Sequence, residues 1–91
     1  MSFDEPIRIP ITGELDLHTF APRDVADVVD AYLQACREKG IFRVRIVHGK
    51  GTGTLRETVH ALLRRRADVI EFHQGNETSG SWGATLVILR G

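Results

Sequence analysis

The 91-residue chain has a mass of 10.2 kDa, which is the size of one domain with one hydrophobic core. Its 42% hydrophobic and 26% charged residues are ordinary for a soluble protein. The single cysteine, Cys36, excludes an intramolecular disulfide and a cysteine-ligated zinc site. No apolar run approaches the roughly 20 residues that span a bilayer, and the first ten residues lack a secretory pattern. We therefore expect a cytoplasmic protein that has no membrane partner.

Charge is distributed unevenly along the chain, although twelve basic residues balance twelve acidic ones. Residues 1–36 hold seven acids and two bases, residues 37–66 hold nine bases and two acids, and residues 67–91 hold three acids and one base. Ten of the twelve bases are arginine, whose planar guanidinium suits phosphate oxygens. The middle segment also contains a glycine-rich loop at residues 49–53. Its arginines and lysines therefore predict a basic face around this loop, and such a face would suit the binding of nucleic acid. The alternative is a cluster of solvated surface charges.

The first half of the chain predicts a strand, a helix and a second strand. After an N-terminal extension (residues 1–12), alternating polarity predicts a strand at residues 14–18. A helix is expected from Pro22 to the glycine at position 40, because Pro is favoured in a first turn and Gly follows a last one. Residues 41–47 predict the second strand, with Arg43 and Arg45 on the face opposite the apolar side chains.

The second half of the chain predicts a further helix and two strands. The helix is expected to begin near Thr54, whose spacing to Glu57 is that of a capping box. The strands are expected at residues 68–73 and 84–89, and the second of them is apolar enough to be central. The right-handed crossover rule makes the first three strands parallel and leaves the last antiparallel. The pattern does not decide whether the helices cover one face of this mixed four-stranded sheet or both.

Histidines stand at the ends of three predicted strands. Because parallel strands end at one edge of a sheet, Asp16, His18 and His48 are candidates to converge there as catalytic residues. The alternative is that each histidine only finishes a strand as a half-exposed polar residue. We interpret His73 in this second way, and His60, within the second helix, as a surface residue.

The strongest local signal is the glycine-rich segment between the second strand and the second helix. Glycines allow close backbone approach, and amide groups at a helix start bind anions. The glycine spacing is neither that of a Walker A loop nor that of a dinucleotide fingerprint, and a tight turn without a ligand is the alternative. The candidate phosphate-binding residues here are Lys50, Gly51, Thr52, Gly53, Thr54 and Arg56, with Arg43 and Arg45 on the preceding strand.

Trp82 falls in a polar loop, where it would either stack on an unpaired base or cap the core.

Three blocks of residues carry a family resemblance. Residues 15–18 (Leu-Asp-Leu-His) resemble the opening motif of the Smr domain, the small MutS-related module found at the C-terminus of MutS2 proteins and as stand-alone proteins. Residues 47–56, from Val47 to Arg56, resemble its central glycine motif, and residues 83–89 resemble its closing strand. Thr19 departs from the family pattern, which usually has glycine there. The resemblance covers residues 14–90, within a predicted domain of residues 13–91.

The resemblance implies a two-layer α/β sandwich of order β-α-β-α-β-β, and it implies nucleic-acid handling. Family members nick or cleave DNA or RNA, some with a divalent metal such as Mg²⁺ or Mn²⁺, and some act at ribosomes. The expected function is that of a nicking endonuclease or endoribonuclease; the alternative is a non-catalytic module that binds nucleic acid or the ribosome. A small-molecule phosphate binder ranks third. Partners in mismatch repair are a further expectation, and no metal ligand is assigned.

Overall fold

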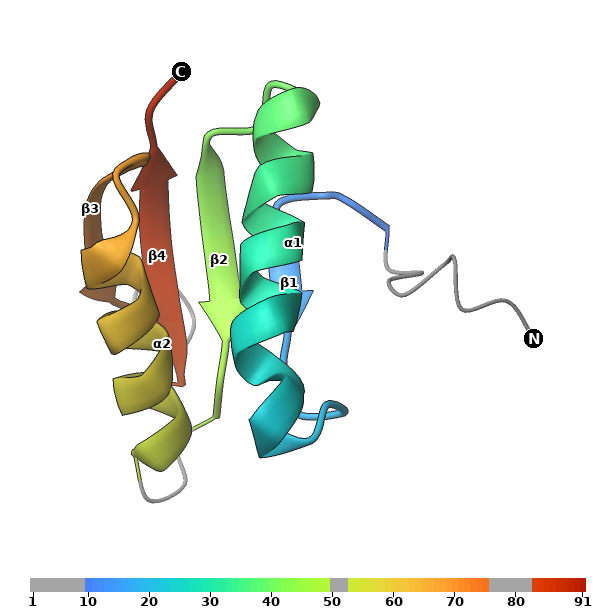
Figure 1. Ribbon diagram of the computed structural model, residues 1–91, viewed down its shortest axis with the longest axis vertical. Coiled ribbons are helices and arrows are strands. Elements are labelled where there is room, and N and C mark those ends of the chain that lie inside the picture. The colour runs from blue at the N-terminus through green and yellow to red at the C-terminus, as the bar shows by residue number, and fades with distance from the viewer. Residues whose placement is uncertain (1–9, 50–52, 76–82) are drawn as a thin grey trace.

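Helices and strands follow one another in the order that the sequence predicts (Figure 1). The computed structural model describes residues 10–49, 53–75 and 83–91. The strands are β1 (Glu14–Asp16), β2 (Arg43–Val47), β3 (Val69–Gln74) and β4 (Ala84–Leu89). The helices are α1 (Val25–Glu38), which a 3-10 turn (Pro22–Asp24) precedes, and α2 (Thr54–Arg65). Most of the predicted N-terminal extension, with Trp82, lies outside the described residues.

The sheet is mixed and has the order β1-β2-β4-β3. β1 pairs in parallel with β2, and β4 pairs antiparallel with both β2 and β3. The first three strands therefore run in one direction and β4 runs in the other, as predicted. β4 lies inside the sheet between two neighbours, which agrees with its almost unbroken apolar sequence.

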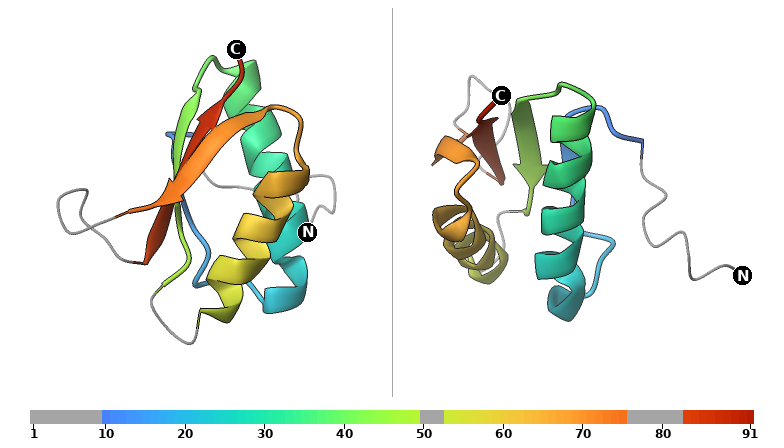
Figure 2. Two further views of the ribbon diagram at one scale, coloured as in Figure 1. Left: turned by 90° about the vertical axis from the view of Figure 1, so that its left-hand side faces the viewer. Right: turned by 45° about the horizontal axis from the view of Figure 1, so that its top comes forward.

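Both helices cover the same face of the sheet, so the domain has two layers (Figure 2). The core between the layers includes Ile46 and Val87 from the sheet and Val29 and Leu63 from the helices. Side chains alternate along a strand, so every second residue of β2 and β4 points to the opposite face. That face, which carries no helix, is called the open face below.

The start of α2 differs from the predicted capping box. Gly53 occupies the N-cap position with φ +87°, and its carbonyl accepts the Glu57 amide at 2.9 Å. Thr54 is the first helical residue, so it cannot act as the cap, and the Glu57 carboxylate lies 3.6 Å from the Arg56 guanidinium. A Cβ at position 53 would lie 3.1 Å from Arg56 Nη2, so both the positive φ and the local packing favour glycine.

Tyr32 of α1 fixes the beginning of β1. Its fully buried side chain ends in a hydroxyl that accepts the amides of Gly13 at 3.0 Å and Thr12 at 3.3 Å. The same hydroxyl donates to the carbonyl of Glu14 at 2.9 Å. The short edge strand β1 is thus attached to the helix layer as well as to β2.

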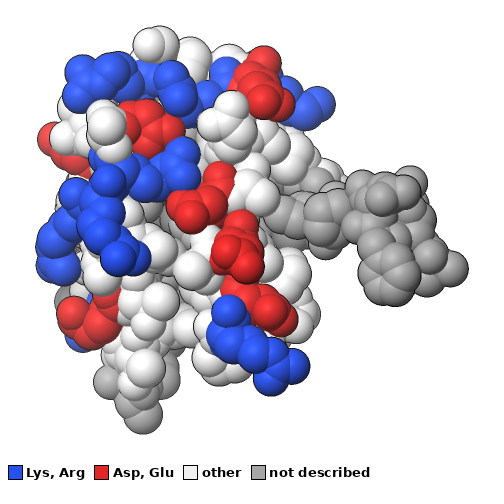
Figure 3. Space-filling model, in the orientation of Figure 1, with Lys and Arg blue, Asp and Glu red and all other residues white. Residues whose placement is uncertain are grey.

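Among the described residues, most of the basic side chains of residues 37–66 lie far from the ends of the glycine segment, so the predicted basic face around it is wrong. α1 and α2 both begin at the end of the molecule where β2 ends, and both run to the opposite end (Figure 1), about 18 Å away along the 12 residues of α2 at 1.5 Å each. On the helix face, blue side chains gather over the end of α2 and red ones follow α1 (Figure 3). Six of the nine bases of residues 37–66 stand at the ends of the helices or at the start of β2: Arg37, Lys39, Arg43, Arg64, Arg65 and Arg66.

One of these distant arginines forms ion pairs that stabilise the fold. Arg66 donates to both carboxylate oxygens of Asp68, at 2.9 and 2.7 Å, and to Asp30 at 2.8 Å. The Arg66 guanidinium lowers the pKa of Asp68 by hydrogen bonding to its charged form.

Among the described helices, none is long and apolar enough to cross a membrane.

Candidate functional site

A hydrogen-bonded carboxylate and imidazole stand at the carboxyl end of β1. Asp16 Oδ1 accepts the backbone amide of His18 at 3.0 Å and lies 2.7 Å from His18 Nδ1. These hydrogen bonds lower the pKa of Asp16, the backbone bond having the larger effect. The side chains are exposed by 51% for Asp16 and 73% for His18. Because the carboxylate engages Nδ1, the His18 ring can present Nε2 to a bound molecule.

Strand alternation explains why these two residues meet. Leu15 and Leu17 are fully buried, so Asp16 and His18 point to the other side. The amide of Leu17 donates to the carbonyl of Val47 at 2.9 Å, beyond the last paired residue of β1. The pair therefore lies beside the end of β2, where the glycine segment begins.

His48 does not join this pair, although it follows the neighbouring strand. It continues the alternation of Val44 and Ile46 and is buried toward the helices. Its Nε2 lies 2.8 Å from Thr85 Oγ1, and its Nδ1 lies 3.1 Å from the carbonyl oxygen of Gly49. The structure thus brings Asp16 and His18 together and places the third candidate on the opposite side of the sheet.

His60 belongs to the network of His48, so the interpretation of it as a surface residue is wrong. Its Nε2 lies 2.8 Å from Thr85 Oγ1, its ring packs edge-on to His48 with 6.2 Å between centroids, and it also contacts Phe72. The signal in the sequence was Thr85, a polar residue inside an apolar strand. A fully buried hydroxyl requires hydrogen-bond partners.

We expect both histidines of this network to make the protein less stable in acid. Burial lowers the pKa of His48 and of His60; Arg56 adds to the effect at His48, and the neighbouring His48 adds to it at His60. The unfolded chain therefore binds protons more readily than the folded one below about pH 6.5. We expect the free energy of unfolding to be level above that pH and to decrease as the pH falls toward 5. Urea unfolding followed by circular dichroism at pH 8, 6 and 5 measures this, and a midpoint that rises in acid would contradict it.

The glycine segment contributes a small hollow at the start of α2. Lys50, Gly51 and Thr52 lie outside the described residues. The remaining candidates Gly53, Thr54 and Arg56 line a hollow of about 260 Å³ together with Pro22, His48, Gly49 and Leu55. A helix N-terminus with an arginine beside it favours an anion electrostatically.

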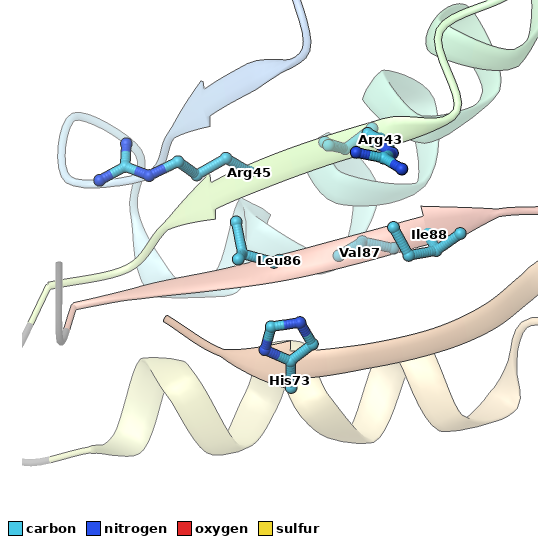
Figure 4. Close-up of a pocket in the computed structure, with 7 residues that line it drawn as sticks. Arg43, Arg45, His73, Leu86, Val87 and Ile88 are labelled. Atoms are coloured by element: carbon cyan, nitrogen blue, oxygen red, sulfur yellow. The ribbon is translucent and has the colours of Figure 1, made fainter. Parts of the chain in front are cut away.

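A larger hollow, of about 420 Å³, lies on the open face (Figure 4). Arg45 pairs across the strands with Leu86, which in turn pairs with His73, and Arg43 pairs with Ile88 in the next row. Arg45 also donates to Glu14 at 2.6 Å. Arg43 is exposed, and within the described residues no ion pair engages it. His73, which the sequence interpretation left without a role, therefore lies with both arginines around an apolar floor.

The described side chains do not form a recognisable metal centre. Within residues 10–49, 53–75 and 83–91, no three His, Cys, Asp or Glu residues gather where they could hold an ion. Asp16 offers one carboxylate, and its Oδ1 is already engaged by His18.

Comparison with known proteins places this arrangement in a family. The family model described as "Smr domain" matches residues 15–90. Among relatives named "Endonuclease MutS2", that of Agathobacter rectalis is 34% identical over 90% of this chain and 10% of its own length. That of Caldicellulosiruptor bescii is 42% identical over 88% of this chain and 10% of its own length. The chain thus spans about a tenth of these relatives.

Two solved structures share the fold. The Smr domain of Thermus thermophilus MutS2 superposes with a TM-score of 0.81 at 35% identity, covering 88% of this chain and all of that domain. YdaL, a stand-alone small MutS-related protein from Escherichia coli, also gives 0.81, at 25% identity over 97% of this chain and 73% of its own. This chain belongs to the Smr domain family.

Proposed function

We propose that this Smr domain binds nucleic acid and cuts its phosphodiester backbone, as a nicking endonuclease or an endoribonuclease. The observation that carries the proposal is the exposed Asp16–His18 pair, with 2.7 Å between carboxylate and imidazole. It lies at the carboxyl end of a parallel strand pair, where α/β sheets place their ligands. The relatives named as endonucleases support the same class of reaction.

In the proposed reaction, the His18 imidazole moves a proton, and the Asp16 carboxylate holds the imidazole in place. Histidine takes up and releases protons near neutral pH, which suits it to accept a proton from the attacking oxygen or donate one to the leaving oxygen. The Asp16 carboxylate engages Nδ1 and so directs Nε2 toward the substrate. Arg56 and the start of α2 would stabilise charge on the phosphate, because aligned donors and cations favour developing negative charge.

The open face supplies the proposed contacts to flanking nucleotides. Arg43 and Arg45 are two residues apart on β2, about 6.6 Å along the strand at 3.3 Å per residue, and they border an apolar floor. Guanidinium groups bind phosphates, whereas an apolar floor accepts the face of a base.

The second candidate function is binding of nucleic acid or the ribosome without cleavage. The observation that favours it is the cationic hollow itself, which does not include Asp16 or His18 among its lining residues. In this case the same arginines would contact phosphates, and His18 would only finish β1.

Incubation with supercoiled plasmid and with single-stranded RNA distinguishes the two functions. Parallel reactions contain Mg²⁺, Mn²⁺ or EDTA, so that dependence on a divalent ion is measured in the same experiment. We expect nicked plasmid or shortened RNA from the purified domain, and none from the Asp16→Ala, His18→Ala double variant. Equal cleavage by that variant would indicate a contaminating nuclease, and retention of nucleic acid without any cleavage would favour the binding function.

Arg43→Ala is expected to weaken nucleic-acid binding by removing one phosphate contact. Each such contact releases about one counterion, so the slope of log affinity against log salt should become shallower by about 1. Fluorescence anisotropy with a labelled oligonucleotide at several salt concentrations measures the slope. The matched control is Arg65→Ala, at the end of α2 on the helix layer, whose slope should stay that of the wild type. Equal loss in both variants would place the nucleic acid elsewhere.

A further inference from the structure

A chain of hydrogen bonds connects α2, β4 and the end of β2 through one buried hydroxyl. Thr85 Oγ1 lies 2.8 Å from His60 Nε2 and 2.8 Å from His48 Nε2, and His48 Nδ1 lies 3.1 Å from the carbonyl oxygen of Gly49. Thr85 is fully buried, and 6% of His48 is exposed. We call His60, Thr85 and His48 the histidine–threonine chain.

The direction of every hydrogen bond in the histidine–threonine chain follows from the contact of His48 with a carbonyl oxygen. A carbonyl oxygen only accepts, so His48 must carry its proton on Nδ1 to donate to Gly49. A neutral His48 then has a bare Nε2, which accepts the only hydroxyl proton of Thr85. His60 must therefore donate from Nε2 to the Thr85 oxygen. The arrangement permits one tautomer of each ring.

The histidine–threonine chain fixes the two ends of the glycine loop relative to each other. The loop leaves β2 at Gly49, where the amides of His48 and Gly49 both donate to the carbonyl of Gly83 at 2.8 Å. It returns at Gly53, the N-cap of α2, the helix that carries His60. A hydrogen-bonded path thus runs from the exit helix through β4 to the loop entry.

We infer that His60, Thr85 and His48 are positioning residues that hold Gly49 and Gly53 at the separation with which the hollow at the start of α2 binds a phosphate of the nucleic acid. This inference rests on the proposed function only in assigning the phosphate to that hollow. It makes His48 a support for the hollow and leaves the proton chemistry to His18. The three residues act by holding the backbone at Gly49 and Gly53.

Protonation of His48 breaks the pattern. A charged His48 would donate from both nitrogens, and the Thr85 proton would then lose its acceptor in a buried place. The lowered pKa values of both histidines agree with this neutral arrangement. The charged groups that face the chain are Arg56, Glu57 and Arg64, all on α2, and the two arginines also disfavour a charged imidazole.

Nuclear magnetic resonance of the ¹⁵N-labelled full chain at pH 8 tests the inference directly. Long-range ¹H–¹⁵N spectra should show His48 protonated on Nδ1 and His60 protonated on Nε2. Any other pair of tautomers would overturn the assigned directions of the hydrogen bonds and, with them, the inference. Because this readout needs no substrate, it is separate from the presence or absence of nuclease activity.

Three variants then test whether the chain positions the loop. Thr85→Val removes the hydroxyl and keeps the shape, so we expect the Gly49 amide to exchange with solvent at least tenfold faster and oligonucleotide binding to weaken about tenfold. Thr85→Ser restores the hydroxyl and should recover both. Leu89→Ala, a core change on the same strand outside the chain, should lower stability without changing either readout. Gly49 exchange that is the same in Thr85→Val as in the wild type would overturn the inference. If Thr85→Val does not fold, the wild-type tautomers and recovery in Thr85→Ser decide.

Discussion

Replacing His18 with alanine is expected to reduce cleavage of nucleic acid by about 10²–10⁴-fold, the usual contribution of a general acid or base. In the proposed reaction the imidazole of the Asp16–His18 pair is the group that moves the proton, and the carboxylate orients it. Its side chain is 73% exposed, so its removal leaves no cavity in the core. The initial rate of plasmid nicking or RNA cleavage, measured with equal amounts of folded protein, gives the ratio.

Asp16→Ala should also reduce cleavage, but less than His18→Ala. The imidazole remains in this variant and loses both the 2.7 Å contact that orients it and the carboxylate that accepts the His18 amide. The matched control is Thr19→Ala, a change at an exposed residue of the same turn, which should cleave like the wild type. Rates that fall equally in all three variants would show that the turn, and not the imidazole, matters.

Removing the side chain of Tyr32 is expected to have the largest effect on stability. Tyr32→Ala should lower the free energy of unfolding by about 3–5 kcal/mol, the range for a buried aromatic replaced by alanine. This is a large part of the 5–15 kcal/mol that stabilises a typical domain. The loss combines apolar packing with hydrogen bonds to Gly13 and Glu14, at 3.0 and 2.9 Å.

Tyr32→Phe separates the two contributions. It retains the ring and should cost about 1–3 kcal/mol, because the carbonyl of Glu14 and the amide of Gly13 lose their buried partner. Urea unfolding monitored by circular dichroism gives both values. Since Glu14 begins the strand that ends at Asp16, cleavage by Tyr32→Phe should fall further than its folded fraction explains. Unchanged stability in this variant would show that the hydroxyl contributes nothing.

Local patterns in the sequence determined most of the fold. Alternation around Leu15 and Leu17 predicted both the first strand and the common side of Asp16 and His18, because side-chain direction in a strand depends only on neighbouring residues. The pairing of β4 inside the sheet followed from its apolar sequence. The capping box failed at Thr54 because Gly53, with its positive φ, already occupied the cap.

The partners of buried polar groups were decided by the tertiary structure alone. Thr85 and His60 are 25 positions apart, and His48 is 37 positions from Thr85. Nothing in local spacing indicates that one hydroxyl joins both rings. A polar residue within an apolar strand indicates a buried group that needs hydrogen-bond partners, but only the packing of the chain decides which residues those partners are.

The sequence by itself therefore determined the order of the elements, the Smr family motifs and the Asp16–His18 pair. The tertiary structure decided that His48 faces the helices, that both helices cover one face, and that most of the basic residues lie away from the glycine loop. The physical reason is the range of the interactions. Periodicity and turn chemistry act over a few residues, but burial and charge clustering depend on which distant segments the fold brings together.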